Sequence, residues 1–210
     1  WITGGNKNLL PEKSVSIEAG ILSVFKFIAN NSVEFTYTYI DAVDKILWKP
    51  GSTIYWTPEN VGNSLSNVVS VTFNSEYSIS SSSSVRINFN YSLNSSVKNN
   101  MDYPGDAAYG KQLIYIPKSM FKFNVGFNAA EFGLGAASVF IGERYSDFEN
   151  KNVMNPDFVL DCNIYYGLNI GNVKALIKFE VNNITNENYQ VISGYPMPLR
   201  NYKLLITLKY

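Results

Sequence analysis

Histidine is absent from this 210-residue chain, and cysteine occurs once, as Cys162. Without histidine the chain alone cannot build a Ser-His triad, a Cys-His pair or a histidine-bearing zinc site. A single cysteine excludes an internal disulfide framework and is expected to be a small apolar filler. An enzyme is therefore not expected, and no residue is predicted to hold a cofactor or a metal.

Charge of one sign is also missing, because Lys+Arg 17 and Asp+Glu 17 cancel to a formal net charge of zero. No basic excess indicates a nucleic-acid partner. No run of roughly eighteen apolar residues occurs, so a membrane-spanning helix is not predicted, whereas a membrane-spanning barrel needs no such run because its strands are half apolar. What the chain has instead is aromatic residues, 15 Tyr and 13 Phe, which favour strands.

Alternation of apolar and polar residues is the main pattern of the chain. It is clear at 85–93, where Val85, Ile87 and Phe89 share one face of a predicted strand. It is weakest where Gly133 and Gly135 blur both faces. The pattern predicts strands at about residues 14–25, 32–48, 65–79, 85–93, 121–128, 132–145, 158–168, 173–182 and 202–210. With no helical stripe anywhere, the fold class is all-β.

The lengths of strands and connections separate two kinds of β protein. Alternation lasts about nine to eleven residues, against about five to six in soluble sheets, and ten tilted residues cover roughly 25 Å, the height of a barrel's apolar band. The connections alternate between short turns and long loops, as in outer-membrane barrels. The long ones are predicted at 49–64, 94–112, 146–157 and 183–200. We expect an antiparallel up-and-down transmembrane β-barrel with these loops outside.

The last predicted strand ends the chain on an aromatic residue. One of its faces is wholly apolar, made by Tyr202, Leu204, Ile206, Leu208 and Tyr210. A strand of this kind is typical of the C-terminus of bacterial outer-membrane barrels. The orientation implied by the loops places Tyr210 at the periplasmic rim.

Several segments then resemble one family in the expected order. Asn182 to Tyr189, followed by Gly194 to Arg200 and the last strand, is similar to the C-terminus of TonB-dependent outer-membrane receptors. Asn8-Leu9-Leu10-Pro11-Glu12-Lys13-Ser14 resembles that family's Asn-Leu-x-Pro-Glu-x-Ser, and Gly110 to Pro117 resembles a segment leading into a later strand. Leu199 departs from the family's usual Gly. The Tyr195-Pro196-Met197-Pro198 variant is reminiscent of cobalamin-receptor-like members.

The resemblance implies a role and an incomplete barrel. Family barrels have twenty-two strands and a plugged lumen, so residues 1–210 would be the C-terminal portion of one barrel domain, with about nine strands. The plug and the N-terminal strands are expected outside this sequence, which opens on Trp1 rather than Met. The implied function is TonB-dependent uptake of a scarce nutrient, a siderophore, a cobalamin or an oligosaccharide, across the outer membrane of a Gram-negative bacterium. The implied partners are membrane lipid, the ligand, the TonB complex through the missing part, and the barrel-assembly machinery, which would read the five apolar residues of the last strand.

Candidate ligand contacts lie in or beside the long loops. They are Tyr55, Trp56, Tyr103, Tyr109, Arg144 and Tyr145. Plainer interpretations are an aromatic girdle at the membrane interface for the first two and solvated loop contacts for the others.

Two other functions stay open at the level of sequence. A soluble, carbohydrate-binding β-sandwich would show the same alternation, with its apolar faces packed on a second sheet. A passive porin-like or structural barrel would lack the plug and the TonB-binding segment.

Overall fold

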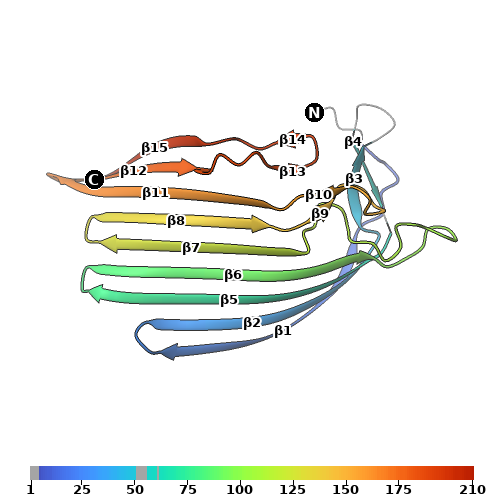
Figure 1. Ribbon diagram of the computed structural model, residues 1–210, viewed down its shortest axis with the longest axis horizontal. Coiled ribbons are helices and arrows are strands. Elements are labelled where there is room, and N and C mark those ends of the chain that lie inside the picture. The colour runs from blue at the N-terminus through green and yellow to red at the C-terminus, as the bar shows by residue number, and fades with distance from the viewer. Residues whose placement is uncertain (1–4, 51–55, 61) are drawn as a thin grey trace.

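One large antiparallel sheet dominates the computed structural model, which describes residues 5–50, 56–60 and 62–210 (Figure 1). Within those residues there is no helix of the length and apolarity needed to cross a membrane. The nine strands of the sheet follow in chain order: β1 (Lys13–Lys26), β2 (Asn30–Val43), β5 (Ser64–Ser80), β6 (Ser83–Lys98), β7 (Ser119–Ala129), β8 (Phe132–Ile141), β11 (Asp157–Ile170), β12 (Val173–Asn182) and β15 (Asn201–Lys209). All nine predicted strands are confirmed.

Short two-stranded hairpins occupy three of the long connections. They are β3 (Ile46–Pro50) with β4 (Trp56–Asn60), β9 (Arg144–Tyr145) with β10 (Val153–Met154), and β13 (Gln190–Ile192) with β14 (Tyr195–Pro196). They correct two predicted boundaries. The second strand ends at Val43 rather than near 48, because Asp44 adopts a left-handed backbone (φ 54°) and the chain turns into β3. The strand predicted to reach 145 ends at Ile141, and Arg144 and Tyr145 pair with β10 instead.

The register gives the sheet an apolar face and a polar face. Phe121 on β7 lies opposite Tyr91 and Phe140, and its ring stacks on that of Phe140 with centroids 5.2 Å apart. The polar face bears hydroxyl and amide pairs, such as Thr36 Oγ1 with Ser70 Oγ at 2.5 Å. One row of register partners on the apolar face runs Ile21, Phe35, Val71, Tyr91, Phe121, Phe140 and Phe158.

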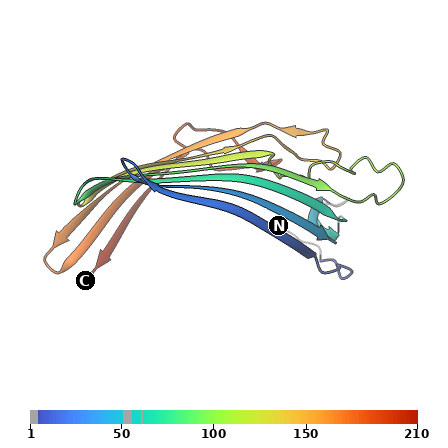
Figure 2. The same cartoon turned by 90° about the horizontal axis from the view of Figure 1, so that it is seen from below.

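Within the described residues, no protein layer lies over the apolar face. Buried apolar side chains are few in the described residues, whereas Ile21 is 73% and Leu204 65% exposed. Figure 2 shows the sheet as one curved layer. Apolar surface this extensive is rare on soluble monomers, and the described residues contain no second large sheet that could cover it. The described residues therefore do not form the two packed sheets expected of a soluble β-sandwich.

The two ends of the sheet differ. The tight turns after β1, β5, β7 and β11 lie at one end, which we call the short-turn end, together with the C-terminus (Figure 1). The three hairpins lie at the other, the long-loop end. The predicted alternation of short and long connections is thus confirmed, and residues from all long connections meet at one edge of the molecule.

Candidate ligand-binding surface at the long-loop end

Three long connections, residues 99–118, 142–156 and 183–200, are joined to one another at the long-loop end, and we call them the loop cluster. Asn150 Oδ1 accepts a hydrogen bond from the backbone N–H of Gln112, and Asn150 Nδ2 donates to the Gln112 carbonyl, both at 2.8 Å. The N–H of Tyr115 donates to the carbonyl of Tyr145, also at 2.8 Å. Because these bonds link residues of different connections, the cluster presents one preformed surface.

Arg144 holds two members of the cluster together. Its Nη2 donates to Asp157 Oδ2 at 2.7 Å and to the carbonyl of Gln190, and its Nη1 donates to the carbonyl of Asn155 at 3.3 Å. The residue is 2% exposed. A buried guanidinium needs such a set of acceptors, because an unpaired buried charge is costly. The sequence predicted Arg144 as a ligand contact, and the structure places it within the loop scaffold.

Lys98, the last residue of β6, anchors the connection that follows it. Its Nζ lies 2.6 Å from both Asp102 Oδ2 and Asp106 Oδ2. Asp106 also accepts the N–H of Ala108 at 2.9 Å. The bond from Lys98, followed by that from Ala108, lowers the pKa of Asp106 to about 2. A carboxylate that stays ionised in this way keeps the connection folded back on β6.

Asp147 organises the β9–β10 hairpin. Its carboxylate accepts backbone N–H bonds from Glu149, Lys151 and Asn152. Burial raises the pKa of Asp147, but these three donors outweigh burial and lower the pKa overall. Asn150, in the same hairpin, has a left-handed backbone (φ 59°), which asparagine tolerates. The turn at Asn150 directs its side-chain amide at Gln112.

The aromatic residues predicted to contact a ligand differ in their exposure and in the elements that carry them. Tyr103 and Tyr109 lie on connection 99–118 and are 60% and 45% exposed. Tyr145 is half-buried, and its hydroxyl accepts from Lys118 Nζ at 2.8 Å while that ammonium lies 5.0 Å from the ring centroid. Trp56 begins β4, and Tyr55 lies outside the described residues. Tyr103 and Tyr109 thus offer ring surface on the outside of the cluster.

A polar cavity of about 200 Å³ lies beside Arg144, where the second and third members of the cluster meet. It is lined by Arg144, Met154, Asn155, Asp157, Asn188, Gln190 and Ser193. The two charged groups in its wall are paired with each other. The free hydrogen-bonding groups are therefore mostly amides and a hydroxyl, chemistry that suits a neutral polar ligand group.

Asn183 organises the segment that follows β12 through hydrogen bonds from its side chain to the backbone. It is 2% exposed with a left-handed backbone (φ 52°). Its Nδ2 donates to the carbonyls of Glu187 and Pro198, and its Oδ1 accepts from the N–H of Glu187. Asn186 Oδ1 then accepts from the N–H of Arg200 at 3.1 Å. The asparagines fold the connection into the turn that starts β15, a role that sequence spacing alone did not reveal.

The five predicted assembly-signal residues lie on β15 and directly after it. Tyr202 on this apolar face stacks on Phe179 of β12, with centroids 6.2 Å apart and planes 13° from parallel. The others are exposed, with β12 on one side of the strand. No part of the described chain covers them.

Side chains that could bind a metal are not gathered in the described part of the chain. No cluster of three or more Cys, Asp or Glu side chains there could hold a metal ion. Cys162 is half-buried on the apolar face, in register with Ala136 and Val181. Small and apolar neighbours of this kind give a thiol no activating charge.

Residues 1–184 match the family described as TonB dependent receptor-like, beta-barrel. The chain belongs to this family of TonB-dependent receptors. Members are outer-membrane proteins of Gram-negative bacteria that bind small-molecule ligands and interact with TonB, and they are receptors and transporters rather than enzymes.

Individual relatives of this TonB-dependent receptor chain are distant. The vitamin B12 transporter BtuB of Vibrio vulnificus (strain YJ016) is 25% identical over 191 residues, which are 90% of this chain and 28% of the relative. BauA, the ferric preacinetobactin receptor of Acinetobacter baumannii, is 16% identical with a TM-score of 0.70, over 94% of this chain and 30% of BauA. The ferric yersiniabactin uptake receptor FyuA of Yersinia pestis has 16% identity and a TM-score of 0.58, over 94% and 29%. The two structural matches show the barrel fold, and this chain spans less than a third of each relative.

Proposed function

We propose that residues 1–210 form part of the barrel wall of an outer-membrane receptor that takes up a scarce nutrient with energy supplied through TonB. The observation that supports this most directly is the apolar face, which is continuous across nine strands and has no protein cover in the described residues. In a membrane, lipid would cover that face, and the polar face would line the barrel interior. The short-turn end would lie in the periplasm and the loop cluster outside.

The nutrient belongs to one of three classes in this proposal: a siderophore, a cobalamin or an oligosaccharide. Two relatives support the first two classes, since BtuB is a vitamin B12 transporter and BauA is the ferric preacinetobactin receptor. The exposed rings of Tyr103 and Tyr109 support binding at the loop cluster, because aromatic faces contribute contact area with little entropy loss.

Uptake by cells that produce the intact receptor tests this function. Labelled siderophores, cobalamin and oligosaccharides are supplied in turn to a strain lacking the receptor gene, to the complemented strain, and to the complemented strain without TonB. We expect one ligand to accumulate only when both the receptor and TonB are present. Accumulation without TonB would instead indicate a passive porin-like barrel.

Ligand contact by the loop cluster has its own test. Replacing Tyr103 and Tyr109 together by Ala should weaken binding by the intact receptor about two- to tenfold. Tyr166→Ala is the matched control, because Tyr166 is an exposed tyrosine on the apolar face of β11. Equal affinity in both variants would exclude these two rings from the ligand site.

The last strand is proposed as the signal for barrel assembly. Tyr210→Ala should lower the amount of folded receptor in the outer membrane, since Tyr210 and its alternating partners form the exposed apolar face of β15. Thr207→Ala on the polar face of the same strand is the control. Heat-modifiable mobility of the intact receptor on gels measures the folded amount, and equal levels in both variants would contradict the proposal.

A further inference from the structure

The polar cavity beside Arg144, which we call the amide cavity, has charged groups in its wall that are already paired. The terminal nitrogens of the Arg144 guanidinium donate to four acceptors: the carboxylate of Asp157 and the carbonyls of Gly142, Asn155 and Gln190. A guanidinium has four terminal N–H groups, so none is left to bond a ligand, although the side chain can border one. An anionic ligand group would lose its water in this cavity without gaining a cationic partner, which is costly.

Three other wall residues have free polar side chains. The amides of Asn155 and Asn188 and the hydroxyl of Ser193 make no hydrogen bond within the described residues. All three residues are exposed, so a ligand can reach them. An amide offers donors and an acceptor, and a hydroxyl offers one donor and acceptor lone pairs. Such a wall is matched best by a ligand group that also both donates and accepts, which a carboxamide or a hydroxyl does.

Hydrogen bonds fix the backbone on both sides of the amide cavity. Arg144 holds the carbonyl of Asn155 at 3.3 Å on one side and the carbonyl of Gln190 on the other. Gln190 Oε1 also accepts the N–H of Gly194 at 2.7 Å, which closes the β13–β14 turn that carries Ser193. A ligand that bonds to a wall fixed in advance has less ordering cost to overcome.

The size and position of the amide cavity suit one group of a larger ligand. Its volume is about 200 Å³, below the roughly 300–1,000 Å³ of sites that enclose a whole drug-sized molecule. Asp157 in its wall precedes Phe158 of the apolar row, so the Asp157 side chain points to the polar face. In the proposed receptor, on which this step rests, that face is turned to the interior, where a ligand must pass.

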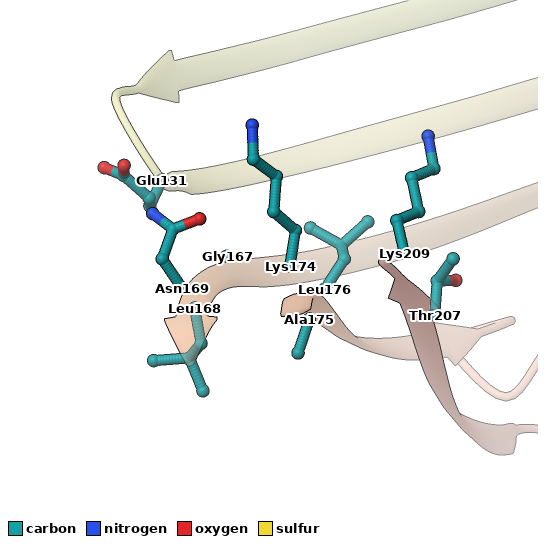
Figure 3. Close-up of a pocket in the computed structure, with 9 residues that line it drawn as sticks. All are labelled: Glu131, Gly167, Leu168, Asn169, Lys174, Ala175, Leu176, Thr207 and Lys209. Atoms are coloured by element: carbon teal, nitrogen blue, oxygen red, sulfur yellow. The ribbon is translucent and has the colours of Figure 1, made fainter. Parts of the chain in front are cut away.

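A second recess shows that unpaired cations do occur in this chain. Lys174 on β12 and Lys209 on β15 extend to the same side of the sheet at the short-turn end (Figure 3). Neither lysine has an ion pair within the described residues. Among those residues, the wall of the amide cavity contains no lysine, and its one arginine is paired. The chemistry of this wall is therefore a local property and not a general lack of positive charge.

We infer that the amide cavity selects a ligand with an uncharged carboxamide or hydroxyl group and bonds that group through Asn188 and Ser193. Of the three nutrient classes proposed above, a cobalamin supplies carboxamides and an oligosaccharide supplies hydroxyls. A ferric catecholate siderophore presents negative charge, for which the wall has no free partner. Asn188 and Ser193 are thus specificity-determining residues of the loop cluster.

The methyl group of Met154, which lies in the wall of the amide cavity, reports whether the cavity is occupied. The intact receptor is labelled with carbon-13 at its methionine methyl groups, and Met154→Leu assigns the signal. We expect at least one neutral probe to shift this signal, cyanocobalamin for a carboxamide or maltohexaose for a hydroxyl. Ferric enterobactin, the anionic probe, should not shift it, and Met120 on β7, outside the wall, is the reference. A signal that neither neutral probe shifts, or that ferric enterobactin shifts, would overturn the inference.

Two substitutions test the bonds themselves. Asn188→Ala and Ser193→Ala each remove a group that makes no bond to the scaffold, so the receptor should fold normally. Its affinity for the probe that shifts Met154 should fall about two- to tenfold in each variant. Asn172→Ala and Ser81→Ala are the matched controls, because both residues are exposed in turns at the short-turn end. Unchanged affinity in both cavity variants would also overturn the inference.

Uptake by cells that produce the same receptor separates this inference from the proposed function. TonB-dependent uptake of ferric enterobactin alone would refute the uncharged ligand and leave the proposed function standing. A Met154 signal that shifts with a neutral probe, in a receptor that takes that probe up without TonB, would support the amide cavity and refute the proposed function.

Discussion

The phenol ring of Tyr165 on β11 lies over the backbone of Gly133 on β8, its register partner. A Cβ at Gly133 would overlap the ring, and the Tyr165 hydroxyl donates to Asn128 Oδ1 on the next strand. Glycine is therefore required for the ring to cross the sheet and reach β7. Covering an exposed strand glycine with an aromatic ring also shields its backbone and helps to fix the register.

Gly133→Ala should therefore destabilise the intact receptor by about 1–3 kcal/mol, because the ring must leave its place or the strands must separate. Gly126→Ala is the matched control, since a Cβ at this polar-face glycine of β7 meets its nearest atom at 4.0 Å. The free energy of unfolding in detergent, followed by tyrosine fluorescence and heat-modifiable mobility, measures both. Equal losses would show that the ring does not depend on the glycine.

Arg144 supplies the next prediction. Arg144→Lys keeps the positive charge, but a single ammonium cannot bond to Asp157, Asn155 and Gln190 together. Arg144→Ala removes the charge and leaves the largely buried carboxylate of Asp157 without its partner. We expect Arg144→Ala to cost about 3–5 kcal/mol in the stability of the loop cluster. Limited proteolysis of the intact receptor should then cleave within residues 142–156 and 183–200.

The control for Arg144 is an ion pair that is open to water. Arg86 and Glu76 are joined at 2.8 Å on the polar face with 66% and 46% of their side chains exposed. Arg86→Ala should cost at most about 1 kcal/mol and leave the loops resistant to protease. Cleavage of the loops in both variants would mean that Arg144 does not hold the cluster together.

The sequence predicted the strands well because each is long enough for its alternation to stand out. Alternation was weakest in β8, where two glycines interrupt it. The structure gives the reason: the side chains of Tyr165 and Asn163 on β11 lie against Gly133 and Gly135 and leave no room for larger residues. The errors fell where the chain leaves the sheet. Asp44 turns the chain through a left-handed conformation that a local pattern of apolar residues does not reveal.

The loop surface could not be predicted in the same way. Asn150 and Gln112 are 38 residues apart, and Arg144 and Gln190 are 46 apart. Such pairs depend on how each connection folds back, which no short-range spacing records. The bonds from the Arg144 guanidinium to other connections were accordingly not predicted, whereas its contact with a ligand stays a prediction. The placement of Tyr103 and Tyr109 in an exposed connection was easier to predict, because both lie in the middle of a long loop.

Asp106 gives a prediction for pH. Its pKa in the folded protein, about 2, lies below the ordinary value of about 3.9. Because the pKa is lower in the folded protein than in the unfolded chain, ionised Asp106 stabilises the fold. This stabilisation is fully present at a pH above the ordinary pKa and is lost as the pH falls towards 2. The amide resonance of Ala108, which donates to this carboxylate, should titrate with a midpoint near 2 in the selectively labelled receptor. Lys98→Met should move that midpoint up towards 3.9, and an unchanged midpoint would exclude Lys98 as the main cause.

The assignment of the two faces leads to the last prediction. Val125 and Asn124 are neighbours in the middle of β7 and point to the apolar and polar faces respectively. If lipid covers the apolar face, Val125→Lys should cost about 2–4 kcal/mol near the membrane midplane and lower the folded receptor in the outer membrane. Asn124→Lys places the same ammonium on the water-filled side, where it loses a 3.3 Å bond to Asn88 and little else. Since both variants add the same side chain, one that is depleted in strands, to the same strand, their difference in unfolding free energy reports the environment of each face. Equal values would contradict lipid on the apolar side.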